Sequence, residues 1–383
     1  MFPTIRRRLT LGVLLAVLLM MLPANAGAAP ELGCAGVSQV PLAECQALEA
    51  LYTSTQGAQW HDKAGWAVTN TPCSWYGVTC QAGHVSQLDL SDNNLAGPLP
   101  AQLSNLTQLR VLILKRNAVT GTVPADLASL AQIQTLDLSE NSLTGAIPTQ
   151  LGNLAALQTL NLSNNQLTGA IPTQLASLAL LQILDLSSNQ LTGSIPPVLG
   201  GMVNLRTLGL NNNQLSGPIP AQLGNLANLR QLLLANNALT GAIPTSLSGL
   251  SNLTSLVLTR NQLNGEIPPQ LGSLRQLTVL MLNGNRLTGA IPPSLGDLSN
   301  LFDLWLHSNA LSGAVPANRC DLAMLLFLDV AFNAMSSAPA CMAFLDPQWA
   351  ETQTVAPAHL SATQAATQAT LTWTPIPYQS DTG

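Results

Sequence analysis

The chain has 383 residues, of which 47% are apolar and only 8% are charged, and its 18 acidic residues outnumber its 13 basic ones. An acidic chain without a basic stripe argues against nucleic acid and against an anionic membrane surface as partners. Single-core domains stop growing well short of this length, so the composition favours an elongated array over one compact globule.

The first 26 residues have the features of a secretory signal peptide. Three arginines at 6–8 precede an apolar run at 9–22, and Ala24-Asn25-Ala26 forms a small-x-small cleavage site. The apolar run is shorter than the ~20 residues that a spanning helix needs, which disfavours the alternative of an uncleaved membrane anchor. We therefore expect a mature chain that is exported and does not insert into the membrane.

Residues 27–84 are predicted to cap the N-terminal end of the domain that follows. Three tryptophans, Trp60, Trp66 and Trp75, could form a sugar-stacking platform. Repeat arrays need covered ends, however, so we expect these rings to close the open end of an apolar core. Pro41 can open a helix before them. The predicted inner face of that helix is Leu42, Cys45, Leu48, Leu51 and Tyr52.

Residues 85–340 repeat one 24-residue unit eleven times without an insertion. In one copy Leu160 and Leu162 are two residues apart, so in a short strand both point into the coil while Thr159 and Asn161 point outward. Asn165 then turns the chain, because its amide can bond backbone groups that a tight coil leaves unpaired. One coil cannot bury its own leucines but stacked coils can, and the spacing L-x-x-L-x-L-x-x-N-x-L indicates a leucine-rich repeat solenoid. The turn asparagine recurs at Asn93, Asn117, Asn141, Asn165, Asn189, Asn213, Asn237, Asn261, Asn285, Asn309 and Asn333.

Two further motifs resemble the plant-type extracellular leucine-rich repeat, the class of polygalacturonase-inhibiting proteins and receptor-kinase ectodomains. They are the L-x-G-x-I-P half of each repeat, as in residues 167–172, and the segment Cys73-Ser-Trp75-Tyr-Gly77-Val-Thr-Cys80 ahead of the first coil. The resemblance implies an α/β repeat solenoid: a right-handed horseshoe with a parallel β-sheet on its concave face, short helical or 3₁₀ turns on its convex face, and disulfide-capped ends. It also implies ligand binding on the concave and lateral faces. In the last copy Ser337 replaces the glycine and Pro339 is displaced by one position, which indicates the end of the array.

Six cysteines flank the repeats as three local pairs: Cys34 with Cys45, Cys73 with Cys80, and Cys320 with Cys341. In an exported chain an even number of cysteines at the two ends predicts disulfides that staple the caps. Proximity favours this pairing, and other pairings among the first four cysteines stay open. The pairs lie too far apart in the chain to share a zinc ion, and we expect neither a metal nor a cofactor.

Residues 341–355 are interpreted as a C-terminal cap and linker. In residues 356–383, Pro357, Leu360 and Trp373 resemble the first two strands of a fibronectin type III domain. The remaining strands of such a module would lie beyond Gly383, which indicates a truncated gene or a fragment. Repeats followed by this module look most like secreted bacterial multidomain proteins, so we interpret the chain as bacterial.

The outward middle position of the strand becomes apolar in four consecutive coils near the C-terminus. Large apolar side chains on a sheet face that could be polar form a candidate contact surface, and tryptophan is common at binding hot spots. The alternative is that these side chains pack on one another along the sheet or under the C-terminal cap. The predicted ligand-binding residues are Trp305, Met281, Val257, Leu233, His307, Asp303, Val279 and Phe327.

The sequence does not predict catalysis. Asp137 and Asp185 face outward two coils apart, which separates them by roughly 9–10 Å, beyond the spacing of a retaining glycosidase pair. The four histidines are scattered, and the sequence contains no Gly-rich phosphate loop or nucleophile motif. We predict a secreted, monomeric, non-enzymatic protein, extracellular or at the cell surface, that binds a protein, peptide or polysaccharide on its concave face. The alternatives are a structural or adhesive spacer without a ligand site, or a hydrolase inhibitor like the polygalacturonase-inhibiting proteins.

Overall fold

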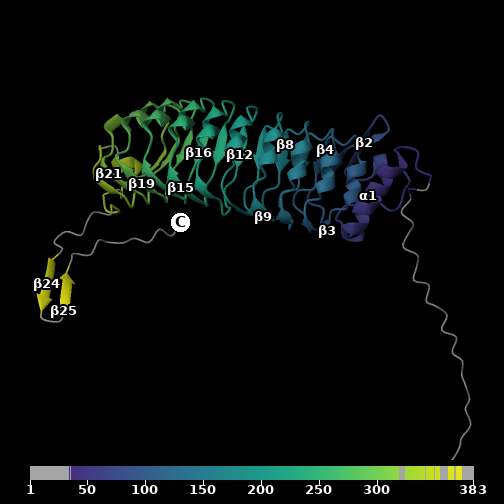
Figure 1. Ribbon diagram of the computed structural model, residues 1–383, viewed down its shortest axis with the longest axis horizontal. Helices are drawn as coiled ribbons and strands as arrows, with labels where there is room; N and C mark the ends of the chain where they lie inside the picture. Colours follow the sequence, from purple (N-terminus) through teal and green to yellow (C-terminus); the bar gives the residue numbers. More distant parts are fainter. Residues whose placement is uncertain are drawn as a thin grey trace, which may run out of the picture.

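The computed structural model describes residues 34, 36–318, 324–340, 342–348 and 350–353, together with the backbone of 361–365 and 368–372. Its coils stack side by side into one elongated array, with the helix α1 (Leu42–Ser54) at the N-terminal end (Figure 1). The predicted signal peptide and the pair Cys320 and Cys341 lie outside the described residues. None of the described helices is long and apolar enough to cross a membrane.

The first half of each repeat contributes one strand to a 12-stranded sheet. Strands from neighbouring repeats are parallel and in register, so that Leu160 pairs with Leu184 and Leu184 with Leu208. The predicted parallel sheet is therefore confirmed for the repeats, whereas β1 of the N-terminal cap pairs antiparallel with β2. The strands are β1 (Val78–Gln81), β2 (His84–Asp89), β4 (Val111–Ile113), β6 (Thr135–Asp137), β8 (Thr159–Asn161), β10 (Ile183–Asp185), β12 (Thr207–Gly209), β14 (Gln231–Leu233), β16 (Ser255–Val257), β18 (Val279–Met281), β20 (Asp303–Trp305) and β22 (Phe327–Asp329).

The second half of each repeat forms another short strand, and in most repeats a 3₁₀ turn follows it. These strands pair in parallel in sheets of two, three and six, which the bridges Thr122–Thr144 and Ser194–Ser216 connect. The strands are β3 (Ala96–Pro98), β5 (Ala118–Thr120), β7 (Thr144–Ala146), β9 (Gln166–Ala170), β11 (Gln190–Thr192), β13 (Ser216–Pro218), β15 (Ala238–Ala242), β17 (Gln262–Glu266), β19 (Arg286–Gly289), β21 (Ala310–Ala314) and β23 (Ala334–Ser337). The turns between the two sets of strands are η3 (Ala101–Asn105), η4 (Ala125–Ser129), η5 (Thr149–Asn153), η6 (Thr173–Ser177), η7 (Pro197–Gly201), η8 (Ala221–Asn225), η9 (Thr245–Gly249), η10 (Pro269–Ser273) and η11 (Pro293–Asp297).

The resemblance to plant-type repeats implies the 3₁₀ turns but not the second strands. Within β9, Leu167 is buried while Gln166 and Thr168 are exposed, which is the alternation of a strand with one buried face. Gly169 follows with a φ of +78°, and a Cβ there would meet only Ala146 at 3.6 Å. Conformation, rather than a lack of space, therefore requires glycine at this position.

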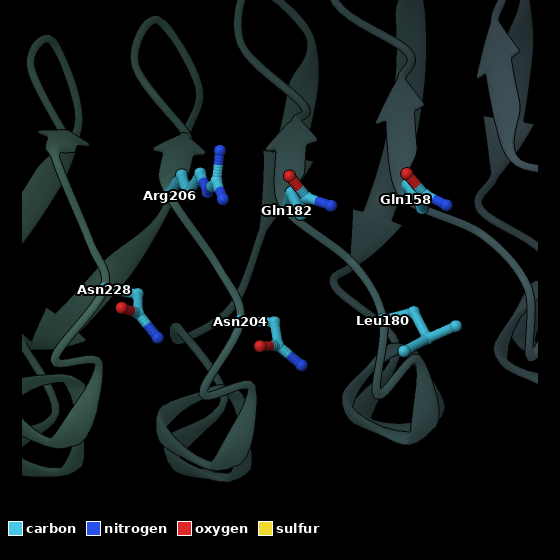
Figure 2. A pocket seen from close by; sticks show the side chains of 6 residues that line it. All are labelled: Gln158, Leu180, Gln182, Asn204, Arg206 and Asn228. Carbon is cyan, nitrogen blue, oxygen red and sulfur yellow. The ribbon is translucent and has the colours of Figure 1, made fainter.

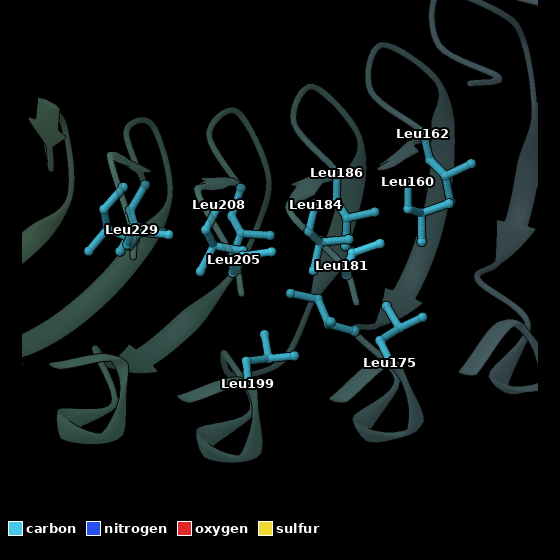
Figure 3. Packing of buried hydrophobic residues seen from close by; sticks show 14 of the residues in the cluster. Leu160, Leu162, Leu175, Leu181, Leu184, Leu186, Leu199, Leu205, Leu208 and Leu229 are labelled. Carbon is cyan, nitrogen blue, oxygen red and sulfur yellow. The ribbon is translucent and has the colours of Figure 1, made fainter. Parts of the chain in front are cut away.

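Leucine side chains fill the interior of the coils, as Figure 3 shows for neighbouring coils in the middle of the array. Leu160, Leu162 and Leu175 of one repeat are fully buried, as are their counterparts Leu184 and Leu186 in the next. Each buried leucine stabilises the fold by about 1.5–3 kcal/mol relative to exposure. Because each coil leaves its leucines open along the array axis, only a neighbouring coil completes their burial.

The turn asparagines form a ladder of hydrogen bonds along the array. Asn165 is buried, and its Nδ2 donates to the carbonyl oxygens of Leu138 (3.0 Å) and Leu162 (3.1 Å). Its Oδ1 accepts from the backbone N–H of Leu143 (2.9 Å). Leu138 and Leu143 belong to the preceding coil, so each asparagine ties its own turn to the coil before it. An unpaired backbone group in this shielded position costs about 1–3 kcal/mol.

Three tryptophans close the N-terminal end of the core, as predicted from the sequence. Trp60, Trp66 and Trp75 are at most 3% exposed, and Trp66 contacts each of the other two rings at a centroid distance of 4.9 Å. Each indole N–H donates to an oxygen of the cap, as Trp66 Nε1 does to the carbonyl of Tyr76 at 2.9 Å. The rings are therefore part of the core cover rather than a sugar-stacking platform.

Two disulfides staple this cap. Cys34–Cys45 ties the start of the described chain to α1, and Cys73–Cys80 joins η2 (Pro72–Ser74) to β1. A further 3₁₀ turn, η1 (Gly57–Gln59), follows α1.

The buried face of α1 differs from the predicted inner face at one residue, Leu42. Cys45, Leu48 and Leu51 are buried and Tyr52 is half-buried, but Leu42 is exposed. A three-residue spacing rotates by about 60° per step on a helix of 3.6 residues per turn. Leu42 therefore lies on the far side of a buried face centred near Leu48.

Gln353 closes the C-terminal end of the ladder. It is buried, its Nε2 donates to the carbonyl oxygen of Val330 (3.2 Å), and its Oε1 accepts from the N–H of Met335 (3.0 Å). Asn333 bonds the equivalent pair of backbone groups one coil earlier. Gln353 thus replaces the asparagine of a further coil. This C-terminal segment also contains the short helix α2 (Met342–Leu345).

Farther along, the backbone forms an antiparallel pair of strands, β24 (Ser361–Ala365) and β25 (Gln368–Thr372). Pro357, Leu360 and Trp373, which suggested a fibronectin type III domain, lie outside the described residues. The assignment of this segment to that domain stays a prediction.

Candidate functional site

An apolar ridge runs across the C-terminal part of the 12-stranded sheet. We use this name for Leu233, Val257, Met281 and Trp305, which end strands β14, β16, β18 and β20 and are successive register partners. The leucine before each of them is fully buried, so by strand alternation the ridge points outward. The first three residues are half-buried, whereas Trp305 exposes 36% of its surface. The indole is therefore the most accessible part of the ridge.

Beside Trp305 the last two coils expose further large apolar side chains. The Phe327 ring lies 5.8 Å from the Phe302 ring, and Phe327, Leu326 and Met324 are each more than half exposed. We call Phe302, Trp305, Met324, Leu326 and Phe327 the aromatic patch. Its side chains are not all packed away under the C-terminal cap, which was the alternative to a contact surface.

Three members of the aromatic patch are absent from the predicted site: Phe302, Leu326 and Met324. They lie just before the strands, outside the positions whose direction strand alternation predicts. The position of Phe302 holds Gln158 and Gln182 in earlier coils, so a change from polar to apolar residues along this row is the signal that identifies it.

His307 packs beside the ridge rather than presenting its ring to a ligand. It is buried, and its ring lies 5.9 Å from the indole of Trp305. Asn283 Oδ1 accepts from Thr259 Oγ1 (2.7 Å), which directs Asn283 Nδ2 toward His307 Nε2 at 2.9 Å. His307 Nδ1 lies 3.0 Å from Ser308 Oγ, so both ring nitrogens have a polar neighbour within the protein.

Asp303 is a carboxylate set among apolar side chains. Its register partners are Val279 on β18 and Phe327 on β22. Burial raises the pKa of Asp303 above its ordinary value, because these neighbours displace water from the charged form. Val279 itself is half-buried and forms one wall of this environment.

The outward aspartates in the N-terminal half of the array accept hydrogen bonds from the turn that follows their strand. Asp137 Oδ1 accepts from the backbone N–H (3.0 Å) and the hydroxyl (2.6 Å) of Ser139, and Asp185 Oδ1 accepts from the N–H of Ser187 (3.0 Å). Asn161, at the equivalent position in the coil between them, accepts the same pair of hydrogen bonds from Ser163. Because asparagine performs this task too, the negative charge is not needed for it.

A shallow cavity of about 230 Å³ lies on the flank of the array near its middle (Figure 2). Gln158, Gln182 and Arg206 line it from one row, and Leu180, Asn204 and Asn228 from a second row nearer the 3₁₀ turns. The amides of both asparagines already donate to backbone carbonyls of the preceding coil, at 2.8 and 2.9 Å. Two of the polar groups that line the cavity are thus engaged in structure.

Family profiles described as leucine rich repeat match residues 83–143, 131–191, 155–215, 203–263 and 276–298, which together make up more than half of the chain. A profile described as the leucine rich repeat N-terminal domain matches residues 43–81. Among curated proteins, the chain is 48% identical over 50 residues to a probable leucine-rich repeat receptor-like protein kinase of Arabidopsis thaliana, which is 13% of this chain and 7% of that protein. It is 51% identical over 55 residues to the protein MALE DISCOVERER 2 of the same plant, 14% of this chain and 8% of that one.

Solved structures extend the similarity over most of the array. The ectodomain of the Arabidopsis thaliana receptor kinase GASSHO1/SCHENGEN3 has 42% identity and a TM-score of 0.68, over 69% of this chain and 32% of that one. The Arabidopsis receptor kinase HAESA, solved with the peptide hormone IDA and the co-receptor SERK1, has 36% identity and a TM-score of 0.69, over 76% and 50%. A plant ice-binding protein has 27% identity and a TM-score of 0.65, over 79% and 97%. The chain thus spans half or less of the two receptor ectodomains.

Proposed function

Because this chain belongs to the leucine-rich repeat proteins of the plant extracellular type, we propose that it is a secreted, non-enzymatic protein that binds a peptide across the apolar ridge and the aromatic patch. The exposed indole of Trp305, where these two surfaces meet, is the observation that supports this proposal most directly. An outward sheet face in water has no need of large apolar side chains in consecutive coils, whereas a binding surface does. The predicted signal peptide supports secretion.

A peptide suits this surface better than a polysaccharide. Leu233, Val257 and Met281 have no side-chain donor and no strong acceptor, and sugars are recognised mainly through hydrogen bonds to hydroxyl groups. An extended peptide, by contrast, directs alternate side chains to one side and can place apolar ones along a row of strands. The structure of HAESA in complex with a peptide hormone supports this class of ligand by analogy.

Selection of random peptides by display on the full chain tests the proposal. We expect selected peptides to lose at least tenfold in affinity, or about 1.4 kcal/mol, for Trp305→Ala. Ile183→Ala is the matched control, because Ile183 is an exposed apolar residue on the same sheet, five coils away. Peptides that bind both variants as well as the unsubstituted chain would refute this site. Failure to select any peptide would favour a spacer without a ligand.

A second candidate function, ice binding, is favoured by the opposite side of each coil. Strands β5, β7, β9 and β11 of four successive coils each expose one threonine, and these strands contain no charged residue. The threonines are Thr120, Thr144, Thr168 and Thr192. Repeated hydroxyl and methyl groups on a regular sheet can hold water in an ordered layer. The similarity to a plant ice-binding protein over nearly its whole length supports this candidate.

Microscopy of ice recrystallisation separates this candidate from peptide binding. If the threonine rows bind ice, the full chain slows crystal growth and Thr168→Lys abolishes the effect, because a charged chain projects from the flat array. Thr159→Lys, in the same repeat but on the 12-stranded sheet, should leave the effect intact. Crystals that grow as they do in buffer alone would eliminate ice binding.

A further inference from the structure

Two carboxylates border the exposed indole of Trp305. Asp303 lies two residues before it on β20, and Asp329 is its register partner on β22. Alternate residues of a strand are roughly 7 Å apart on one face, and neighbouring strands are separated by ~4.8 Å. A group that rests on the indole therefore comes within reach of both carboxylates.

Within the described residues, no Lys or Arg nitrogen lies within 4.0 Å of either carboxylate. His307 Nε2 is 3.8 Å from Asp329 Oδ2, beyond hydrogen-bond distance, and lies closer to Asn283 Nδ2, at 2.9 Å. Glu140, near the N-terminal end of the array, differs in that two cationic side chains pair with it, at 3.2 and 4.0 Å. The negative charge beside Trp305 is thus left for a ligand to neutralise.

The surroundings of Asp303 strengthen its attraction for a cation. Val279 and Phe327 flank it in register, and their displacement of water raises the pKa of its carboxyl group. A partly desolvated carboxylate gains more from an incoming cation than a fully solvated one does, because less water screens the pair. The indole adds a second attraction, since a cation is drawn to the face of tryptophan.

We infer that the peptide carries a lysine or arginine whose cationic group lies over the indole of Trp305, between Asp303 and Asp329, with a neighbouring apolar residue on the ridge. This inference rests on the proposed function and adds the chemistry of the ligand. The same charges repel acidic peptides, so the aromatic patch discriminates by charge as well as by apolar contact.

The test measures binding of the full chain to a positional-scanning library of synthetic hexapeptides. Each position of the hexapeptide is varied among Lys, Arg, Leu, Phe and Glu. Asp329→Asn removes the charge but keeps the hydrogen bond that Asp329 Oδ1 accepts from the N–H of Ala331 (2.9 Å), as Asn161 does naturally at the equivalent position. Asp303→Asn is the second variant. Asp185→Asn is the matched control, with the same change at the same position of an earlier coil.

The unsubstituted chain should prefer peptides with Lys or Arg over matched peptides with Leu by about tenfold, and each aspartate variant should reduce that preference about threefold. Asp185→Asn should leave the preference unchanged, and affinity for the uncharged peptides should be the same in all of these variants. Peptides that bind through Trp305 without a preference for Lys or Arg, or with a preference that survives both aspartate variants, would overturn the inference while leaving the proposed function in place. A library in which no peptide binds would overturn both.

Discussion

Replacement of Gln353 by alanine should loosen the C-terminal end of the array while leaving the other coils intact. The side chain accepts a hydrogen bond from the shielded N–H of Met335 and donates one to the carbonyl of Val330, to which Asn333 also donates. The lost N–H bond alone leaves a buried donor unpaired, at about 1–3 kcal/mol, and the weakened carbonyl adds about 1 kcal/mol. We therefore expect Gln353→Ala to lower the local stability of the last coil by about 2–4 kcal/mol.

Amide hydrogen exchange read by mass spectrometry measures this loss segment by segment. Because each coil contacts only its neighbours, exchange should accelerate in residues 324–340 and remain unchanged before η9. Gln348→Ala is the matched control, since Gln348 is exposed and takes part in the cap through its backbone carbonyl. If residues 324–340 exchange at the same rate in Gln353→Ala and in the control, Gln353 does not act as the closing residue of the ladder.

Two further predictions concern single residues. A Cβ at Gly152 would lie 2.3 Å from the carbonyl oxygen of Gln174, whereas a Cβ at Gly201 would meet no atom within 4 Å. In urea denaturation, Gly152→Ala should therefore lower the unfolding free energy by about 1–3 kcal/mol. Gly201→Ala should raise it by about 0.4–1 kcal/mol. Burial raises the pKa of Asp303 in the folded chain above the ordinary value of about 3.9 for an aspartate. The folded chain therefore binds the carboxyl proton more tightly than the unfolded chain does. The resulting stability is lost as the pH rises from the unfolded pKa through the folded pKa. Asp303→Asn should therefore gain unfolding free energy relative to the unsubstituted chain across that window, and a difference independent of pH would contradict this account.

The repeat itself could be predicted from the sequence because its physics is local. Leu160, Leu162 and Asn165 stand at fixed spacings, and strand alternation together with the needs of a tight turn assigns each of them a direction. The sequence also predicts that the three tryptophans of the N-terminal cap cover the core, because the first coil of an array has no preceding coil to bury its leucines. Gln353 escaped prediction because it replaces an asparagine without lying at the repeat spacing.

The candidate site was only partly predictable. Trp305 and Phe327 follow from the outward strand positions, but Phe302 contacts Phe327 from the preceding coil, just outside the strand. The direction of His307 depends on Asn283 and Thr259 one and two coils earlier. No periodic pattern within one repeat contains that chain of hydrogen bonds.

The sequence by itself determined the solenoid, its parallel sheet and the polarity of its faces, because one 24-residue pattern dictates the same local geometry in every coil. The stacking of the coils decided which outward residues became a surface. It buried His307 beside the ridge, left the indole of Trp305 accessible, and placed Asp303 between Val279 and Phe327. The burial of a side chain and the pairing of its charge depend on residues of neighbouring coils, and only the tertiary structure brings those coils together.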